Sequence, residues 1–574
     1  MRKIQREEIL WIIVVMTFIL AVFFYGIGRV YGFSLFPDEF GYWASAAKAA
    51  GYDWSEISSL GSYYSFGYSL ILVPILWIFR DALWAYRAAV TVNAVLLLAS
   101  FLLLNRILKR LLPELKSGMR ILFSGIAICY PTWFLYMNMT MTEIVLVFAF
   151  ILVCFFLLRY LETMHIGDLL LTTLSALYLY TVHMRTVAIV FAVVLTIVIR
   201  IITKEKNAGK IMKRLLFVCL VLGIGILAVT VGKRLVQESV YAEADVSVLA
   251  NNDYAGQWQK VLSIFTWKGM GEFLVSLIAK IFYLGMASFG LFYYAAAWII
   301  RRATDRREQK GRRCFYLFLL LAIMGQILIC AIYTKGYGRI DGLLYGRYDE
   351  NILPMVMALG CVALMDMKHP HWILIGMLGT GLPVVALIEH VIVKYQMTNL
   401  HEGYFISGMS YLLRYITFEP ENYFWKAFAL ACVFCLILYG MFMLIRRHKD
   451  LLWILCIVIG MECLLGLSLG EYYTFRYNTL SYADLQLGYQ LRDMCEEADR
   501  RIVSYGNNSE DHFISSIQFV LRDTRIYLAE EGAFQELQES DLVLVSGTHG
   551  EEEKLSEYYA EKKGYGSFWL YYNP

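Results

Sequence analysis

Hydrophobic residues in this chain are grouped into long runs separated by short polar connections. The first run (9–30) and the next long one (82–104) can each cross about 30 Å of hydrocarbon as a helix. Between them, a run of only 12 residues (68–79) contains Pro74, which is typical of an interfacial or re-entrant helix. The pattern predicts 13 membrane-spanning helices, at 9–30, 82–104, 120–138, 143–159, 168–182, 186–203, 214–232, 275–299, 314–333, 351–366, 372–394, 423–445 and 450–470.

Composition supports this interpretation and excludes a soluble enzyme. Of the 574 residues, 59% are hydrophobic and only 17% are charged, whereas soluble proteins carry about 25% charged residues. The eleven cysteines lie mostly in apolar runs, which argues against a disulfide-stapled fold. The first run is too long for a cleaved signal peptide and lacks a cleavage site, so it is interpreted as the first span.

Clusters of lysine and arginine predict how the chain is oriented in the plasma membrane. The positive-inside rule places all of these clusters in the cytoplasm, so an even number of spans must separate consecutive clusters. That requirement excludes 68–79 as a span and places 31–81 outside, as one loop with interfacial helices. The N-terminus is then cytoplasmic and the C-terminus extracytoplasmic. The clusters lie at 2–6, 106–120, 200–214, 301–313 and 446–449.

After Gly470 the long apolar runs end and the charge becomes acidic. Residues 471–574 contain 19 acidic and 9 basic side chains. Strand-like runs (RIVSY, TRIYLA, DLVLVSG) alternate with helix-like stretches (LQLGYQLRDMCEEAD, HFISSIQFVLRD, EEKLSEYYAEKK), which predicts a small α/β domain with a mostly parallel sheet. The chain therefore divides into a membrane domain (1–470) and an extracytoplasmic domain (471–574). The acidic balance argues against a nucleic-acid partner.

Adjacent carboxylates, Asp38 and Glu39, follow the first span in the sequence FPDEFGYW. Such a pair at the membrane surface could supply a general base together with a metal or orienting ligand. The alternative is structural: Asp38 would cap a helix at 39–50, and Glu39 would add favourable charge to its first turn.

Further ionisable residues stand near the predicted outer ends of spans. Glu143 could face the same cavity as Asp38, or could simply follow the capping residue Thr142. His183 and Arg185 occupy the apex of a helical hairpin, where an arginine could grip a phosphate or extend to lipid headgroups.

The segment 333–354 combines basic residues with four tyrosines and four glycines. Lys335, Arg339 and Arg347 in this setting suggest a loop that binds a phosphorylated, hydroxyl-rich ligand. An interfacial aromatic belt would explain the tyrosines equally well but the arginines less well.

The order of these motifs resembles that of a known family. Asp38-Glu39 is followed by YYSFGYSLILVPIL, by a span with an early arginine (WAYRAAVTVNAVLL), by Pro131 with Glu143, and by Gly346-Arg347-Tyr348 with Pro354. Over about residues 1–370 the chain is similar to the GT-C membrane glycosyltransferases, specifically the bacterial protein O-mannosyltransferase and aminoarabinose-transferase superfamily.

The resemblance implies an inverting transferase that uses a polyprenyl-phosphate sugar donor and an extracytoplasmic glycan, lipid or protein acceptor. Asp38 would be the catalytic base with Glu39 as its partner, and Glu143 would line the same site. Arg185 and Arg347 would hold the donor phosphate. His183 and Tyr348, their neighbours, are predicted to contact substrate, and a divalent metal bound by Asp38 and Glu143 is an open alternative.

Two other functions stay open at this stage. A flippase or transporter should carry charges inside its spans, and Lys280 and Glu462 fit that description. A non-catalytic scaffold for envelope assembly would use 471–574 as its binding module, and Asp38→Ala would then have no effect.

Overall fold

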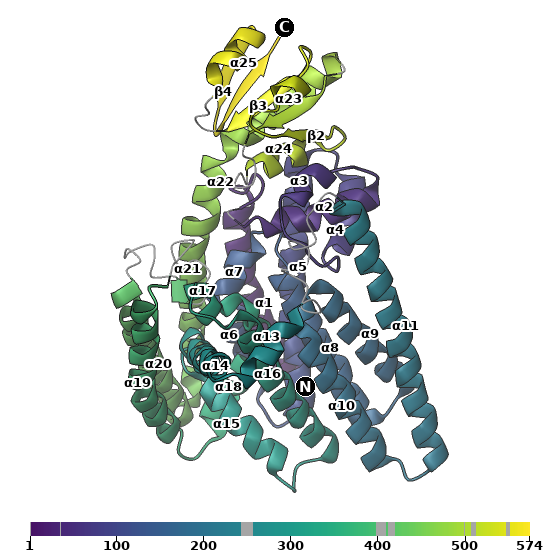
Figure 1. Cartoon of the computed structure of the whole chain (residues 1–574). Helices are drawn as coiled ribbons and strands as arrows, with labels where there is room; N and C mark the ends of the chain where they lie inside the picture. Colours follow the sequence, from purple (N-terminus) through teal and green to yellow (C-terminus); the bar gives the residue numbers. More distant parts are fainter. Residues whose placement is uncertain are drawn as a thin grey trace.

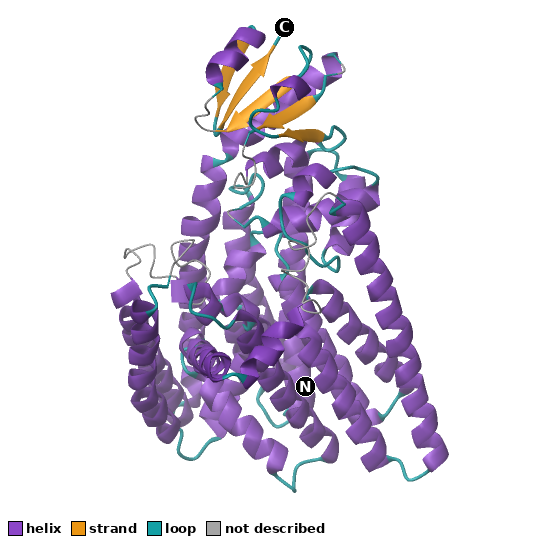
Figure 2. Cartoon of the chain, viewed as in Figure 1, coloured by secondary structure: helices purple, strands orange, loops and turns teal. Residues whose placement is uncertain are grey.

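The computed structural model describes residues 2–34, 36–242, 257–397, 409–410, 420–498, 500–506, 513–546 and 551–574. A bundle of long helices carries a small β-sheet domain at one end (Figures 1 and 2). The helices are α1 (Arg2–Ile27), α2 (Asp38–Ala50), α3 (Ser55–Ser59), α4 (Ser69–Ile78), α5 (Ala82–Leu111), α6 (Ser117–Ile128), α7 (Pro131–Met137), α8 (Glu143–Thr163), α9 (Ile166–Val182), α10 (Val187–Lys204), α11 (Ala208–Val240), α13 (Trp258–Leu262), α14 (Trp267–Ala287), α15 (Leu291–Thr304), α16 (Lys310–Thr334), α17 (Ile340–Leu343), α18 (Leu353–Asp366), α19 (His371–Lys394), α20 (Pro420–Arg447), α21 (Leu455–Gly470), α22 (Arg476–Leu480), α23 (Tyr482–Glu497), α24 (Phe513–Leu521) and α25 (Glu552–Tyr558).

The structure confirms a polytopic helical membrane protein but not the predicted number of spans. Within the described residues, ten helices are long and apolar enough to cross a bilayer, or eleven if α6 and α7 form one span bent by 59°. The bend lies at Pro131, which lacks an amide hydrogen and disrupts a continuous helix. Helix α9 and α18, predicted as spans at 168–182 and 351–366, have only 17 and 14 residues.

The span predicted at 275–299 is wrong as a single helix. It divides into α14 and α15 at a turn in which Phe289 and Gly290 have φ angles of 50° and 83°. A left-handed backbone cannot continue a right-handed helix. The hydrophobic pattern is uninterrupted across this turn and therefore gave no sign of it.

The segment predicted as an outer loop, 31–81, forms three short helices rather than a span. Helices α2, α3 and α4 pack together beneath the sheet domain at one end of the bundle (Figure 1). Helix α2 is unusually well buried, with every residue from Glu39 to Ala47 shielded from solvent. The helix that begins with the candidate base is therefore fixed by packing.

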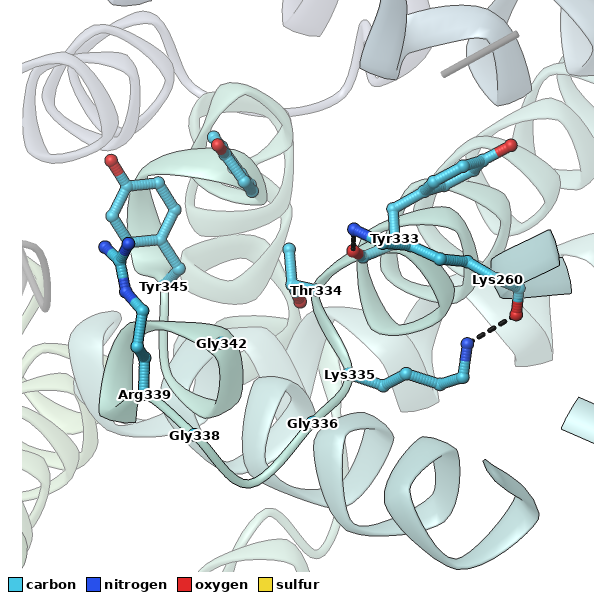
Figure 3. A pocket seen from close by; sticks show the side chains of 10 residues that line it. Lys260, Tyr333, Thr334, Lys335, Gly336, Gly338, Arg339, Gly342 and Tyr345 are labelled. Atoms are coloured by element: carbon cyan, nitrogen blue, oxygen red, sulfur yellow. Dashed lines mark hydrogen bonds between the residues drawn. The ribbon is translucent and has the colours of Figure 1, made fainter. Parts of the chain in front are cut away.

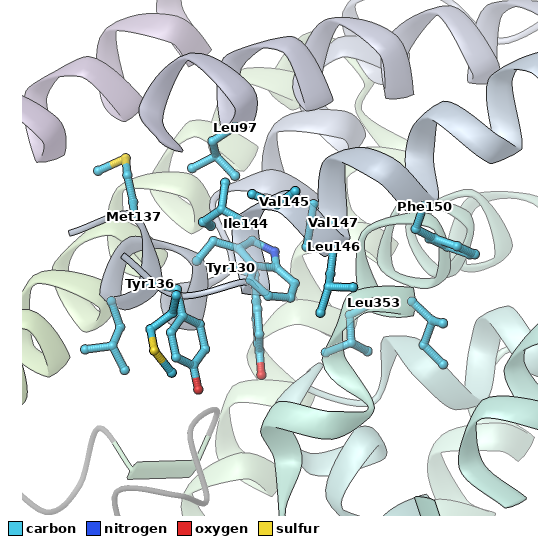
Figure 4. Packing of buried hydrophobic residues seen from close by; sticks show 14 of the residues in the cluster. Leu97, Tyr130, Tyr136, Met137, Ile144, Val145, Leu146, Val147, Phe150 and Leu353 are labelled. Atoms are coloured by element: carbon cyan, nitrogen blue, oxygen red, sulfur yellow. The ribbon is translucent and has the colours of Figure 1, made fainter. Parts of the chain in front are cut away.

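Side chains at and around α7, α8 and α18 form part of the core. Figure 4 shows Tyr130, Tyr136, Leu146 and Leu353 among the buried side chains near the start of α8. All four are at most 1% exposed. Close packing of this kind places Glu143, the first residue of α8, on a rigid support.

The C-terminal domain contains a five-stranded sheet in the order β2-β1-β3-β5-β4. As predicted, the first three strands in sequence are parallel, but the last two form an antiparallel hairpin that the sequence patterns did not predict. Helix α25 accordingly ends at Tyr558, and the last two lysines of EEKLSEYYAEKK, Lys562 and Lys563, belong to strand β4. The strands are β1 (Ile502–Tyr505), β2 (Ile526–Ala529), β3 (Leu542–Ser546), β4 (Glu561–Tyr565) and β5 (Phe568–Tyr572).

The predicted boundary at residue 470 lies inside a continuous helical segment. One helical run extends from Lys449 to Glu497 and includes a π-helical turn at Glu471–Phe475. The change in composition at Gly470 is therefore not a break in the chain's path, and the sheet begins only at Ile502.

Candidate active site

Three ionisable residues that are far apart in the sequence meet at one point. Arg347 Nη2 lies 2.6 Å from Asp38 Oδ2, and Arg347 Nε lies 2.5 Å from Glu143 Oε1. Arg347 and Glu143 are almost completely buried, with side chains 4% and 2% exposed, whereas the Asp38 side chain is 20% exposed. Asp38 is thus the more exposed of the two carboxylates in this cluster.

The structure contradicts the predicted side-chain caps of Asp38 and Thr142, although Glu39 and Glu143 do lie in the first turns of their helices. Helix α2 begins after Pro37 without a side-chain cap, and the Asp38 carboxylate instead accepts a hydrogen bond of 3.0 Å from the Tyr64 hydroxyl. Helix α8 likewise has no side-chain cap from Thr142. Both carboxylates are therefore directed into the cluster.

Arg185 lies next to this cluster and is fully buried. Its Nη2 is 3.5 Å from Glu143 Oε1, and its guanidinium lies 4.9 Å from the centre of the Tyr348 ring. These contacts exclude the alternative in which Arg185 extends to lipid headgroups.

His183 packs edge-on against Tyr348, with ring centres 6.1 Å apart. Its Nδ1 accepts the backbone N–H of Arg185, which fixes the turn between α9 and α10. Burial, with a further contribution from the charges of Arg185 and Arg347, lowers the pKa of His183 well below its usual value. His183 is therefore neutral near pH 7, consistent with an accepting Nδ1.

Glu39 faces away from Asp38 and is enclosed by hydrogen-bond donors. Its Oε1 accepts the N–H (2.7 Å) and O–H (2.5 Å) of Ser34, and its Oε2 accepts the N–H and O–H of Thr140 (2.7 and 2.6 Å) and the O–H of Tyr86 (2.7 Å). Burial raises the pKa of Glu39, while these hydrogen bonds act to lower it. Both oxygens of the Glu39 carboxylate are engaged in hydrogen bonds that join α2 to the start of α8. We therefore assign Glu39 a positioning role in place of the predicted role as catalytic partner.

Glu39→Gln is expected to destabilise the protein by about 1–3 kcal/mol, the usual cost of an unsatisfied buried polar group. A backbone N–H points at each carboxylate oxygen, so the glutamine NH₂ must face a donor in either orientation. Thermal unfolding of the purified protein in detergent measures the change, and the matched Asp38→Asn should shift the melting temperature less. Equal melting temperatures for wild type and Glu39→Gln would contradict this role.

Two glycines permit close approaches that shape the cluster. A side chain at Gly41 would overlap the ring of Tyr64, which donates to Asp38. A side chain at Gly346, next to Arg347, would overlap Tyr283. Tyr64 was not predicted as a site residue, because its approach to Asp38 depends on packing across a glycine 23 positions earlier in the chain.

Lys280, noted as a charge within a predicted span, pairs with a residue of the same site. Its Nζ lies 3.9 Å from Asp349 Oδ2, and both side chains are 1% exposed. Burial raises the pKa of Asp349 to about 6, although Lys280 acts in the opposite direction. Lys280 thus extends the cluster around residues 347–349 and does not mark a separate path across the membrane.

A cationic pocket of about 440 Å³ adjoins the cluster (Figure 3). Arg339 and Tyr345 line one side, and Lys260 and Lys335 line the other. No carboxylate is present among the described residues that line it. The pocket connects to the cluster through Tyr345, whose hydroxyl accepts a hydrogen bond of 3.2 Å from Arg347 Nη1, and Tyr348 lines the pocket as well.

Burial lowers the pKa of both lysines of this pocket below the usual value for lysine. Lys260 Nζ donates to the carbonyl of Tyr333, and Lys335 Nζ donates to the carbonyl of Lys260. The two ammonium groups are thus held at the pocket wall. Lys260 was missed as a site residue because its own segment shows no informative spacing.

Asp38 and Glu143, the possible metal ligands, are bridged in this structure by a cationic side chain of the protein itself. Arg347 lies between the two carboxylates and contacts both. In the part of the chain that the structure describes, no three His, Cys, Asp or Glu side chains are grouped so that they could hold a metal ion.

Comparison with solved structures identifies the fold. No family model matches the sequence, and no curated protein matches it. The structure of ArnT from Cupriavidus metallidurans bound to undecaprenyl phosphate superposes with a TM-score of 0.56 at 14% identity, covering 98% of this chain and 97% of that one. The apo state of the same protein gives a TM-score of 0.54 at 13% identity, with the same coverage. The chain has the GT-C fold.

The match extends over the sheet domain as well as the membrane helices, because almost the full length of both chains is aligned. Within this GT-C chain, the cluster of Asp38, Glu143, Arg185 and Arg347 lies where the segment 31–81 meets the long apolar helices. The resemblance inferred from motif order is therefore confirmed at the level of fold.

Proposed function

We propose that this GT-C protein is an inverting glycosyltransferase that transfers a sugar from a polyprenyl-phosphate donor to an acceptor hydroxyl outside the cytoplasm. The observation that carries the proposal is the contact of Arg347 with both Asp38 and Glu143, beside a cationic pocket. The site thus offers a solvent-accessible carboxylate next to positive groups, which suits attack by a hydroxyl on a sugar bonded to a phosphate.

The cationic pocket is the proposed binding place of the donor phosphate. Lys260, Lys335 and Arg339 supply positive charge without a competing carboxylate among the described lining residues. A phosphate there lies next to Tyr345 and Tyr348, and the attached sugar would extend towards Asp38. The fold neighbour bound to undecaprenyl phosphate supports a lipid of this class.

In the proposed reaction, Asp38 accepts the proton of the acceptor hydroxyl as the oxygen attacks the anomeric carbon. The new C–O bond forms on one face of the sugar while the bond to the phosphate oxygen breaks on the other, which inverts the configuration. The electron pair leaves with the polyprenyl phosphate, whose charge the basic residues stabilise.

Arg347 has a further proposed role, which is to release Asp38 from its ion pair so that Asp38 can act as the base. In this structure its Nη2 is paired with Asp38 and its Nε with Glu143. A donor phosphate that takes over the Nη2 hydrogen bond would release the Asp38 carboxylate for the acceptor, while Glu143 keeps the guanidinium in place. Donor binding would thus prepare the base for the reaction.

The proposed orientation puts this site outside the cytoplasm. The loops joining α10 to α11 and α15 to α16, which contain two of the basic clusters, lie at the end of the bundle opposite the sheet domain (Figure 1). The positive-inside rule assigns that end to the cytoplasm. Nucleotide sugars are then on the wrong side of the membrane, which explains the need for a lipid-linked donor.

Binding of undecaprenyl phosphate to the purified protein tests the assigned pocket. We expect the double variant Lys335→Met, Arg339→Met to bind at least about tenfold more weakly, because each charge-assisted hydrogen bond contributes about 1.5–3 kcal/mol. Lys368→Met, an exposed lysine in the connection between α18 and α19, is the matched control and should bind normally. Equal affinity of the double variant and wild type would place the phosphate elsewhere.

Donor binding is also expected to weaken as the pH rises. Only protonated lysines attract the phosphodiester of a polyprenyl-phosphate sugar, whose single negative charge is constant above neutrality. Because the pKa values of Lys260 and Lys335 lie below that of an ordinary lysine, affinity should fall at a lower pH than about 10.4. Titration of donor affinity against pH measures this, and an affinity constant up to pH 10.4 would contradict it.

A further inference from the structure

The C-terminal segment holds both ends of the outer loop that carries Asp38. At the start of the loop, Asn478 Oδ1 accepts the backbone N–H groups of Tyr31 (2.7 Å) and Gly32 (3.0 Å). At its end, the Tyr489 hydroxyl donates to Asp81 Oδ2 over 3.0 Å. Both polar groups belong to the helical segment that leads from the membrane into the sheet domain.

The middle of the loop is held by two arginines that follow α24. Arg525 pairs with Asp53 and Glu56 at 2.9 and 2.8 Å. The carbonyl of Arg522 accepts the indole N–H of Trp54 at 2.8 Å, and its guanidinium donates to the carbonyl of Phe79 at 2.7 Å, just beyond the end of α4.

Arg522 has a φ angle of 49°, in the left-handed region that non-glycine residues rarely adopt. Such a conformation persists only where surrounding contacts enforce it. The contact with the outer loop is therefore a built feature of the fold.

Phe519 of α24 inserts into an aromatic cluster of the outer loop. Its ring centre lies 4.9 Å from those of Phe33 and Trp43 and 6.1 Å from that of Trp54. Phe519 is 1% exposed. Aromatic pairs at these separations are favourable beyond the area that they bury.

A continuous chain of contacts leads from this ring to Glu39, the neighbour of the candidate base on α2. Trp43 lies on α2, five residues after Asp38, and its indole N–H donates to Thr140 Oγ1 at 3.0 Å. The Thr140 hydroxyl in turn donates to Glu39 Oε2 at 2.6 Å. Phe519 thus packs against Trp43, which lies one helical turn after Glu39 on α2.

We propose that the C-terminal domain acts as a clasp on the first outer loop, with Phe519 as a positioning residue that keeps Asp38 aligned for catalysis. The consequence for turnover rests on the proposed transferase activity, but the positioning itself does not. The domain is then part of the catalytic apparatus, and it acts through α2 without touching the substrate.

A matched control exists because the domain has two separate cores. Phe519 belongs to the hydrophobic cluster that continues into the membrane domain, whereas Leu555 of α25 packs in a smaller cluster on the opposite face of the sheet. Both side chains are buried. Leu555→Ala should therefore disturb the domain without loosening the clasp.

The test compares Phe519→Ala with Leu555→Ala in the full-length protein by hydrogen–deuterium exchange and by steady-state kinetics. We expect Phe519→Ala to raise amide exchange in residues 38–59 at least about tenfold, and Leu555→Ala to leave exchange there unchanged. Turnover should fall about 10²-fold in Phe519→Ala, the usual cost of misaligning a reacting group by about 1 Å, with the donor KM unchanged. Unfolded enzyme would also lower the apparent kcat at an unchanged KM, so turnover is expressed per folded protein, and Leu555→Ala, which also disturbs the domain, should keep the wild-type kcat.

Arg525→Ala provides a second variant in case Phe519→Ala does not fold, and it should raise exchange at residues 53–59. Unchanged exchange in 38–59 for both variants, or equal changes in Leu555→Ala, would overturn the clasp. If the wild type transfers no sugar but the exchange pattern is as expected, the clasp stands and the proposed transferase function fails.

Discussion

Asp38→Asn is expected to reduce sugar transfer by about 10²–10⁴-fold, the contribution of a well-placed general base. The amide has nearly the same shape and can still accept the Tyr64 hydroxyl, but it cannot take a proton from the acceptor. Donor binding should not weaken, because Asp38 does not line the assigned phosphate pocket and the neutral amide competes less than the carboxylate with the donor phosphate for Arg347 Nη2. Initial rates at saturating donor measure the effect.

The control for Asp38→Asn is the neighbouring Glu39→Gln. The first variant should lose activity with little loss of stability, and the second should lose stability first, because Glu39 accepts five hydrogen bonds inside the protein. If Asp38→Asn retains full activity, Asp38 is not the base.

Arg347→Lys should reduce kcat/KM by about 10²–10³-fold, the range found when one donor to a developing negative charge is removed. The guanidinium contacts Asp38, Glu143 and Tyr345 through three different nitrogen atoms. A lysine ammonium is a single point charge on a flexible stem and cannot bridge two carboxylates in a fixed geometry. Steady-state kinetics with a varied donor concentration gives both kcat and KM.

Arg302→Lys is the matched control for Arg347→Lys. Arg302 also pairs with two carboxylates, Glu308 and Asp366, but it lies at the far end of α15. Its conservative replacement should leave the kinetics unaffected. Full activity and donor affinity in Arg347→Lys would show that neither the phosphate nor the base depends on the guanidinium fork.

The sequence predicted which residues belong to the cluster but not which residues each of them contacts. Asp38, Glu143, Arg185 and Arg347 were recognisable because ionisable residues near the ends of apolar spans are costly unless they are used. The adjacency of Asp38 and Glu39 was misleading: consecutive residues of a helix point about 100° apart, and here one faces the cavity while the other faces the protein. Periodicity alone could not assign the two roles.

Other features depended on tertiary contacts without a local signal. The turn at Phe289 and Gly290 interrupts a uniformly apolar run, so hydropathy did not reveal it. Lys260 joins the cationic pocket only because its helix packs beside the end of α16. The clasp of Phe519 on Trp43 brings together residues that are 476 positions apart in the sequence, and no pattern along the chain indicates it.

The alternative functions make different claims about the same residues. A flippase would use charges within its spans, but Lys280 is paired with Asp349 next to the cluster. Glu462, the other charge within a predicted span, is buried in α21, which lies far from Lys280 and Asp349 in the sequence. A scaffold would tolerate the loss of Asp38. We favour the transferase because the partly exposed carboxylate of Asp38, the arginines and the cationic pocket adjoin one another.

The most direct measurement is sugar release from a panel of polyprenyl-phosphate sugars by the purified protein in liposomes, with wild type and Asp38→Asn compared at equal folded concentration. Our account predicts that wild type transfers or hydrolyses the sugar of at least one donor and that Asp38→Asn does not. Movement of the labelled lipid between leaflets, with no sugar released by either protein, would contradict the account and favour a flippase.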